Sequence, residues 1–249
     1  MDFKNKAVIV TGASSGIGAS IAVEFSAAGA NVTIVGRNET KLAAVAKKCK
    51  NALVIRADIS KENDLRNIID ETIKKFGQLD ILINNAGTAL GNGGLVDGEI
   101  MKHYDTIMNV NLKGVVHLTS LAAPHLIKTK GNVINISSIA GQMPPFGDGM
   151  TNYYVSKAGL DHFTVCAAVE LARYGVRVNV VSPGPVTTDL LINSESSITW
   201  DDFPQKTLLS RVSKPEEIAN LVLFLASDKA KAITGSNIVS DNGMLIKRG

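Results

Sequence analysis

The alternation of short apolar runs with amphipathic stretches constrains the fold of this 249-residue chain most strongly. An apolar run at residues 7–10 ends in Thr11 and Gly12, a helical pattern covers residues 19–28, and a second apolar run covers residues 31–35. Short apolar runs of this kind are typical of strands that are buried on both faces of a parallel sheet. The start of the chain is therefore predicted to be a strand–helix–strand unit whose first turn is rich in glycine.

The same alternation continues to residue 239. Further strands are expected at residues 52–56, 79–84, 132–137, 177–182 and 234–239, and further helices at 39–48, 61–76, 103–128, 152–174 and 215–226. Strands that alternate with helices throughout a chain form doubly wound sheets, which bind ligands outside the carboxyl ends of the strands. The predicted fold class is α/β, with a Rossmann-type, doubly wound, seven-stranded parallel sheet in three α/β/α layers and a single domain over residues 1–249.

Two segments interrupt the alternation, and both follow a predicted strand. Residues 88–98 hold four glycines among polar residues, and residues 184–213 form the longer of the two connections. A connection of that length in a compact domain is usually a lid, a binding loop or a disordered segment. The apolar residues inside it favour a substrate lid at approximately residues 185–213.

Composition limits the possible partners. The net charge is +3 and no run of lysine or arginine forms a binding strip, so nucleic acid is not an expected partner. No apolar stretch is long enough to span a membrane, and the charged N-terminus gives no sign of a signal peptide. The two cysteines form no CxxC pair, which indicates a reducing, cytoplasmic location, and Cys166 is interpreted as a small buried hydrophobe.

The glycine-rich turn after the first strand is a candidate phosphate-binding site. Its spacing is G-x-x-x-G-x-G, and the expected cofactor contacts in it are Gly12, Ser14, Ser15, Gly16, Ile17 and Gly18. Glycines permit a tight turn and let a phosphate approach backbone N–H groups at the N-terminus of a helix. A glycine triplet can also be a structural turn, but its place between a strand and a helix favours nucleotide binding.

The end of the second predicted strand indicates which dinucleotide is bound. Folds that prefer NAD usually carry an acidic residue there for the adenosine ribose. Here Gly36 is followed by Arg37, whose guanidinium can hold a 2′-phosphate. The sequence therefore favours NADP(H) over NAD(H) as the cofactor.

Tyr153 and Lys157 are four residues apart on a predicted helix, so their side chains lie one above the other. An ammonium beside a phenol favours the phenolate, and the pKa of Tyr153 is expected to fall from ~10 toward neutral. This spacing alone also occurs in ordinary surface pairs. Tyr154 has Ala158 at the corresponding position and points about 100° away, so it is assigned to packing or to the pocket wall.

The motifs taken together resemble the classical short-chain dehydrogenase/reductase family. The resemblance rests on TGASSGIG (11–18), Asp58, NNAG (84–87), NVNLKG with Asn111, NVINISS with Ser138, the Tyr153–Lys157 pair and PGPVTTD (183–189). It implies that Tyr153 is the general acid/base, that Lys157 lowers its pKa and holds the nicotinamide ribose, and that Ser138 bonds the substrate oxygen. It also implies that Asn111 shapes its helix to hold a water that relays protons to Lys157.

The resemblance further implies which residues contact the cofactor, and no metal site is expected. Asp58 and Ile59 would meet the adenine, Asn85, Ala86 and Gly87 would line the adenosine side, and Pro183, Gly184, Val186 and Thr188 would face the nicotinamide. The implied reaction is hydride transfer between nicotinamide and a carbonyl or secondary alcohol.

The predicted pocket segments are mostly apolar. They contain Met143, Pro144, Pro145, Phe146, Met150, Pro185, Leu190, Leu191 and Ile192. This composition favours a hydrophobic ketone or alcohol, such as a steroid, isoprenoid, retinoid-like or xenobiotic compound. A 3-oxoacyl-thioester reductase remains an alternative, as does a nucleotide-binding regulatory protein without activity. A lyase or epimerase is disfavoured because such relatives usually carry a separate substrate domain.

The predicted helix at residues 152–174 has apolar or small residues on nearly every face. A helix that is apolar all round is buried on all sides. One face can meet the sheet, and another is expected to meet a partner subunit, so a homo-oligomer, either a dimer or a tetramer, is predicted.

Overall fold

Seven parallel strands form the centre of the computed structural model, which describes residues 1–90, 93–145, 149–190 and 199–247. The strands are β1 (Ala7–Thr11), β2 (Asn31–Gly36), β3 (Leu53–Arg56), β4 (Ile81–Asn84), β5 (Asn132–Ile136), β6 (Arg177–Pro183) and β7 (Asn237–Ser240). Their order in the sheet is β3-β2-β1-β4-β5-β6-β7. Every residue of β1, β4 and β5 is buried, because helices cover both faces of the sheet.

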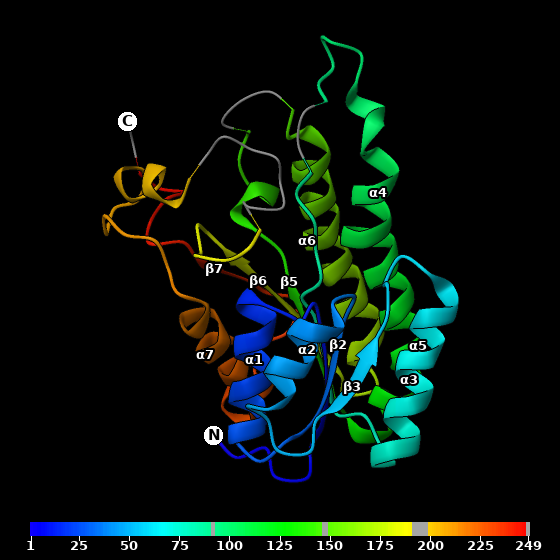
Figure 1. Ribbon diagram of the computed structural model, residues 1–249. Coiled ribbons are helices and arrows are strands. Elements are labelled where there is room, and N and C mark those ends of the chain that lie inside the picture. Colours follow the sequence, from blue (N-terminus) through cyan, green and yellow to red (C-terminus); the bar gives the residue numbers. More distant parts are fainter. Residues whose placement is uncertain (91–92, 146–148, 191–198, 248–249) are drawn as a thin grey trace.

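The helices form the two outer layers (Figure 1). One core cluster contains side chains of α1 (Gly16–Ala27), α2 (Glu39–Ala46) and α7 (Pro215–Ala226), and a second cluster contains those of α3 (Glu62–Phe76), α5 (Gly114–Thr129) and α6 (Thr151–Ala172). Successive side chains of a strand point to opposite faces of the sheet, so one strand can contribute to both clusters. In β1, Val8 and Val10 lie in the first cluster and Ile9 lies in the second. The predicted Rossmann-type, three-layer α/β/α fold is confirmed.

The order of the strands reverses at the centre of the sheet, where β1 pairs with both β2 and β4. Neighbouring carboxyl ends at such a switch point leave a crevice that ligands can enter. The glycine turn follows β1 at this point, and Asn85 follows β4. Both motifs therefore meet at one edge of the sheet.

The helix expected at residues 103–128 is three elements. These are α4 (Tyr104–Met108), a π-helical turn at Asn109–Lys113, and α5. Asn111 lies at the centre of the wide turn and is fully buried. A Cβ on Gly114 would lie 2.3 Å from the carbonyl oxygen of Ile59, so the chain needs glycine where α5 begins. The prediction of one continuous helix was wrong at this turn.

The last strand begins three residues later than predicted. Gly235 has a φ of +68°, a left-handed conformation that breaks an extended chain, and β7 starts at Asn237. Thr234, expected in the strand, instead accepts a hydrogen bond from the backbone N–H of Val178 through its side chain.

The ends of the long connection after β6 lie side by side. The N–H of Ser213 bonds the carbonyl oxygen of Pro185 at 3.0 Å, and the N–H of Thr187 bonds the carbonyl oxygen of Ser213 at 3.0 Å. Within the connection, Trp200–Asp202 and Pro204–Lys206 form short 3-10 turns. Leu191 and Ile192, and Phe146 in the earlier segment, lie outside the described residues.

The outer face of α6 is open to solvent in the single chain. Val155 is 49% exposed, Val165 is 43% exposed and Val169 is 75% exposed. Cys166 is exposed beside them, so the prediction of a buried thiol was wrong for this chain alone. The helical pattern showed that α6 is apolar all round, but it did not show which face the sheet covers. Within the described ranges, no helix is long and apolar enough to cross a membrane.

Candidate active site

A cavity of about 740 Å³ lies where the carboxyl ends of the central strands meet. It brings together many of the predicted residues: Gly12, Ser14, Ser15, Gly16, Ile17, Arg37, Asp58, Ile59, Asn85, Ala86, Gly87, Tyr153, Lys157, Thr188 and Leu190. They come from segments that are far apart in the sequence. The strand–helix alternation alone predicted this location.

The glycine turn is held by the residues that flank it. Gly12 has a φ of +66°, and a Cβ on Gly18 would lie 2.4 Å from both the side-chain nitrogen of Asn85 and the carbonyl oxygen of Gly12. The hydroxyl of Thr11 accepts hydrogen bonds from the N–H groups of Asn85 (3.0 Å) and Ala86 (3.1 Å). The turn after β1 and the segment after β4 therefore form one connected floor of the cavity. Thr11 was not singled out in the sequence, because its role depends on pairing across the sheet.

Charged side chains gather at the end of the cavity beside β2. Arg37 lines it together with Asp58, whose pKa is lowered because hydrogen bonds from Ser60 and the charges of Arg37 and Lys61 outweigh burial. Lys41 in the first turn of α2 also lines it and donates to Asp189 at 2.6 Å.

The Lys41–Asp189 ion pair links α2 to the start of the long connection and was missed in the sequence. Only the pairing of these two distant residues reveals it. Its hydrogen bond holds the pKa of Asp189 below the usual value.

Tyr153 lies at the other end of the cavity and is buried. Burial raises the pKa of its phenol to about 12, while a hydrogen bond with Ser138 opposes the rise and Tyr154 adds to it. The expectation that Lys157 draws the pKa of Tyr153 toward neutral was wrong for the protein alone. The ammonium nitrogen lies 5.7 Å from the centre of the phenol ring, and desolvation outweighs its attraction.

Lys157 is itself buried, and burial makes its ammonium easier to deprotonate. Desolvation lowers its pKa to about 8, while the charge of Asp161 opposes the shift. Its Nζ donates to the carbonyl oxygen of Ile136 at 3.0 Å and would lie 3.6 Å from a Cβ on Gly87. The side chain is therefore fixed between the end of β5 and the segment after β4.

Asn111 ties the π-helical turn to the cavity wall rather than facing the cavity. Its Oδ1 accepts from the N–H of Thr88 at 2.8 Å, and its Nδ2 donates to the carbonyl oxygen of Thr88 at 2.8 Å and to the hydroxyl of Ser156 at 3.0 Å. These bonds fix the segment after β4, which carries Gly87, next to Lys157. The sequence implied that Asn111 shapes its helix, and the wide turn at Asn109–Lys113 is consistent with that role.

Ser138 follows β5 and begins a short 3-10 turn, η3 (Ile139–Gly141). Its hydroxyl accepts from the N–H of Ala140 at 3.1 Å, and its hydrogen bond with Tyr153 places the two hydroxyls together. An apolar cluster surrounds this pair and contains Ala89, Ala140, Met150, Tyr154 and Leu190. Tyr154 therefore packs beside Tyr153, which agrees with the packing role predicted for it.

Several predicted residues do not line the cavity. These are Gly18, Asn111, Ser138, Met143, Pro183, Gly184, Pro185 and Val186, while Leu191 lies outside the described residues. Val186 is 4% exposed and belongs to the main apolar core, and Gly184 packs against Asp241. Residues 183–186 thus pack behind the site. After β6, Thr188 is the first residue that lines the cavity.

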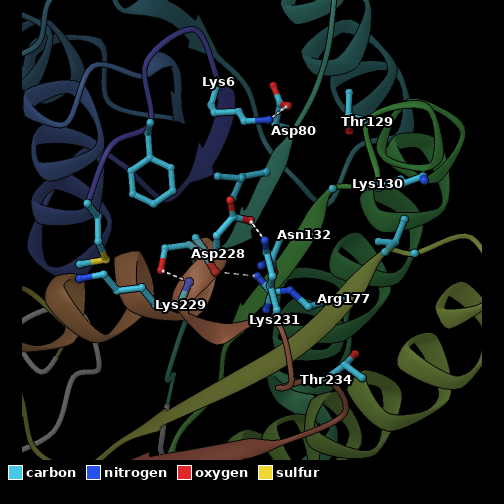
Figure 2. Close-up of a pocket in the computed structure, with 18 of the residues that line it drawn as sticks. Lys6, Asp80, Thr129, Lys130, Asn132, Arg177, Asp228, Lys229, Lys231 and Thr234 are labelled. Carbon is cyan, nitrogen blue, oxygen red and sulfur yellow. Dashed lines mark hydrogen bonds and ion pairs between the residues drawn. The ribbon is translucent and has the colours of Figure 1, made fainter.

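A second cavity of about 650 Å³ lies at the opposite, amino-terminal ends of the strands (Figure 2). Its lysines enter from different sides, with Lys6 paired to Asp80 at 2.9 Å. Arg177 and Asn132 donate to the carbonyl oxygen of Leu225, the next-to-last residue of α7. The hydrogen bonds of Arg177 and Asn132 hold α7 against the sheet, and the side chains drawn in Figure 2 do not point toward a common ligand position. In the described part of the chain, no group of His, Cys, Asp or Glu side chains could hold a metal ion.

The donor set of the first cavity fits a dinucleotide. Arg37 and Lys41 supply cations at one end, the glycine turn supplies backbone N–H groups at the N-terminus of α1, and Tyr153 and Lys157 stand at the other end. With a parallel sheet that reverses at this point, the fold and the site define a Rossmann-type dinucleotide-binding protein.

Comparisons with known proteins identify the family. The chain matches the family model described as enoyl-(acyl carrier protein) reductase over residues 12–245. It is 37% identical over 246 residues to the 3-oxoacyl-(acyl-carrier-protein) reductase FabG of Staphylococcus epidermidis, an alignment that covers 96% of this chain and 99% of that protein.

Two solved structures are similar over nearly the whole chain. A short-chain dehydrogenase/reductase of unknown function from Caenorhabditis elegans, solved with cofactor, has a TM-score of 0.93 and 34% identity and covers 99% of this chain and 97% of its own. The 3-ketoacyl-(acyl-carrier-protein) reductase of Brucella melitensis complexed with NADH has a TM-score of 0.90 and 31% identity and covers 98% and 100%. The chain therefore belongs to the short-chain dehydrogenase/reductase family of oxidoreductases.

Proposed function

We propose that the protein is an NADP(H)-dependent oxidoreductase that interconverts a carbonyl and a secondary alcohol, with Tyr153 as the general acid/base. The observation that carries this proposal is that Tyr153 and Lys157 both line the cavity, while Ser138 is hydrogen-bonded to Tyr153. A bound nicotinamide supplies the hydride. Ser138 and Tyr153 orient the substrate oxygen, and Tyr153 gives or takes its proton.

The protein alone holds Tyr153 protonated, because burial raises its pKa to about 12. That state suits reduction, in which the phenol donates a proton to the carbonyl oxygen. Lys157, fixed by the carbonyl of Ile136, supplies the positive charge that stabilises the phenolate left behind. Asn111 acts on this pair by holding the segment that carries Gly87 against Lys157.

Replacing Tyr153 tests the assignment. The variant Tyr153→Phe should lose turnover by ~10²–10⁴-fold, the usual contribution of general acid catalysis, while it still binds NADPH. Tyr174→Phe, which removes the same hydroxyl at an exposed position beyond the end of α6, is the matched control. Measurement of NADPH oxidation with a carbonyl panel and of NADPH fluorescence gives both quantities. Near-normal turnover in a folded Tyr153→Phe variant would contradict the proposal.

Two substrate classes are supported by different observations. The apolar cluster of Met150, Tyr154 and Leu190 beside Tyr153 favours a hydrophobic ketone or alcohol. The relative from Staphylococcus epidermidis favours a 3-oxoacyl thioester. Comparison of kcat/KM for a bicyclic ketone and for acetoacetyl-coenzyme A, each with NADPH and NADH, distinguishes them. Turnover of neither, with dinucleotide binding intact, would favour a regulatory protein without activity.

We also propose that the chain forms a homo-oligomer through the outer face of α6. Val155, Val165 and Val169 make an apolar stripe on that face. A cytoplasmic location stays a prediction from the two unpaired cysteines.

A further inference from the structure

Asp161 is a buried acid on the same helix as the proposed catalytic pair. Tyr153, Lys157 and Asp161 follow one another at intervals of four residues on α6, so their side chains share one face. Both carboxylate oxygens of Asp161 are buried, and neither meets a hydrogen-bond donor of suitable geometry within the described residues. Buried polar atoms are nearly always hydrogen-bonded, so an unpaired carboxylate calls for a physical reason.

Lys157, one helical turn before Asp161, is the cation whose charge acts on this carboxylate. Burial raises the pKa of Asp161, while the side chains of Ser137 and Asn237, as nearby but poorly aligned hydrogen-bond donors, and the charge of Lys157 oppose the rise. Ser137 and Asn237 are neutral, and the packed turn η3 contributes Ile139, Ala140 and Gly141, which carry no charge.

Among the residues that the structure describes, Asp161 is the charged group that acts on Lys157. Its Nζ meets the carbonyl oxygen of Ile136, and the nearby Gly87 and Asn111 are neutral. Tyr153 is protonated in the protein alone, because burial raises its pKa to about 12. Burying a single charge away from water costs several kcal/mol of desolvation free energy, and an opposite charge nearby offsets part of that cost.

Asp161 also supports the turn that begins with Ser138. A Cβ on Gly141 would lie 2.7 Å from Oδ2 of Asp161 and 3.0 Å from the backbone nitrogen of Ala158. The turn η3 therefore rests directly on the part of α6 that carries Asp161. The Asp161 side chain thus lies against the turn that begins with Ser138 and acts electrostatically on Lys157.

We propose that Asp161 is a positioning residue of the reaction. Its buried carboxylate is the counter-charge that keeps Lys157 an ammonium, and its side chain packs against η3, the turn that begins with Ser138. The inference rests on the proposed function, because Asp161 acts only through Lys157, Ser138 and Tyr153. Loss of its charge makes Lys157 neutral at lower pH. The phenolate of Tyr153 then loses its stabilising charge, so both rate and pH dependence change.

Titration of Lys157 tests this without substrate or cofactor. In protein labelled with [ε-13C]lysine, Lys157 is assigned by its loss in Lys157→Met and followed by NMR between pH 6 and 11. Asp161→Asn should shift its titration to lower pH by about half a unit or more. Asp161→Glu, which keeps the charge, should shift it less, and Glu170→Gln on the exposed face of α6 should not shift it. An unchanged titration in Asp161→Asn would overturn the proposal.

The reciprocal measurement covers the case in which Asp161→Asn does not fold. Coupling between two sites is mutual, so Lys157→Met should raise the titration midpoint of the Asp161 carboxyl. No change in that midpoint would count against the proposal.

With any carbonyl that is turned over, the pH dependence of kcat should also move in Asp161→Asn and return in Asp161→Glu. A moved Lys157 titration in a chain that turns over no carbonyl would overturn the proposed function and leave the charge pairing supported.

Discussion

Single polar residues around the cavity have a structural role as well as a proposed chemical one. The amide of Asn85 donates to the carbonyl oxygens of Thr11 and Gly12, and the amide of Asn111 is bonded on both sides. These groups hold the backbone that lines the cavity. A motif read from the sequence names such residues, but it does not show which partners they bond.

The proposed role of Arg37 in selecting NADP(H) can be tested with a single substitution. The variant Arg37→Asp should reverse the preference from NADPH toward NADH, because a carboxylate repels a 2′-phosphate and can bond the ribose hydroxyls. The ratio of kcat/KM values for the two cofactors measures the change, expected to exceed about tenfold. Lys47→Asp makes the same change of charge at an exposed position just beyond α2. An unchanged ratio in Arg37→Asp would show that another group selects the cofactor.

At the scale of elements, the sequence predicted all seven strands because each is a short apolar run between turn residues. It did not predict the π-helical turn at Asn109–Lys113, which depends on contacts of Asn111 with Thr88 and of Gly114 with Ile59. It also missed the link between α2 and the segment after β6. Such features depend on pairs of residues that are distant in sequence, and a single sequence contains no signal for them.

The ion pair between Lys41 and Asp189 gives a test of that link. Exposed pairs contribute about 0–1 kcal/mol, so Lys41→Met and Asp189→Asn should each speed the release of NADPH by about two- to fivefold. The double variant should be no faster than the single ones, because the pair is lost in each. Stopped-flow fluorescence measures the rates, with Lys47→Met as the matched control. Additive effects would mean that the two side chains act separately.

The start of α7 gives a pH test of stability. Arg211 donates two hydrogen bonds to Glu217, and the N–H of Lys214 donates a third. Mainly through Arg211, the pKa of Glu217 falls from 4.5 to about 2. A depressed pKa of this kind stabilises the fold fully above about pH 4.5, and the contribution is lost as the pH falls toward 2.

Urea unfolding at several pH values should therefore show Glu217→Gln less stable than the unaltered chain at pH 7. The difference should shrink between about pH 4.5 and pH 2. Glu216→Gln removes a neighbouring exposed charge without these bonds and serves as the control. A difference that does not depend on pH would show that the carboxylate is not the source of the stability.

At the scale of the whole molecule, the sequence predicted the location of the site better than its chemistry. Strand–helix alternation predicted that ligands bind outside the carboxyl ends of the strands, and the cavity lies there. The predicted fall in the pKa of Tyr153 was wrong because the pKa depends on burial, which the spacing of two residues does not reveal. The prediction that Cys166 is buried was wrong for the same reason, since the fold decides which face of α6 is covered.

The exposed stripe on α6 gives a test of assembly. A charge at Val169, which is 75% exposed, should leave the single chain folded but disfavour burial against a second copy. Sedimentation should show a multiple of 26.3 kDa for the unaltered chain and a single-chain species for Val169→Asp. Glu170→Asp, which keeps the charge of the next residue, is the control. A single-chain species of the unaltered protein would contradict the proposed oligomer.

The π-helical turn at Asn109–Lys113 has a consequence for how this chain tolerates changes in length. A π turn usually arises from one extra residue within an α-helix. Deletion of that residue would restore regular α-helical geometry, and side chains within the turn would rotate about the helix axis by up to about 100°. Asn111 would then point away from Thr88. Single-residue insertions and deletions should therefore be tolerated least here, in the middle of a helix whose surface could accept many substitutions.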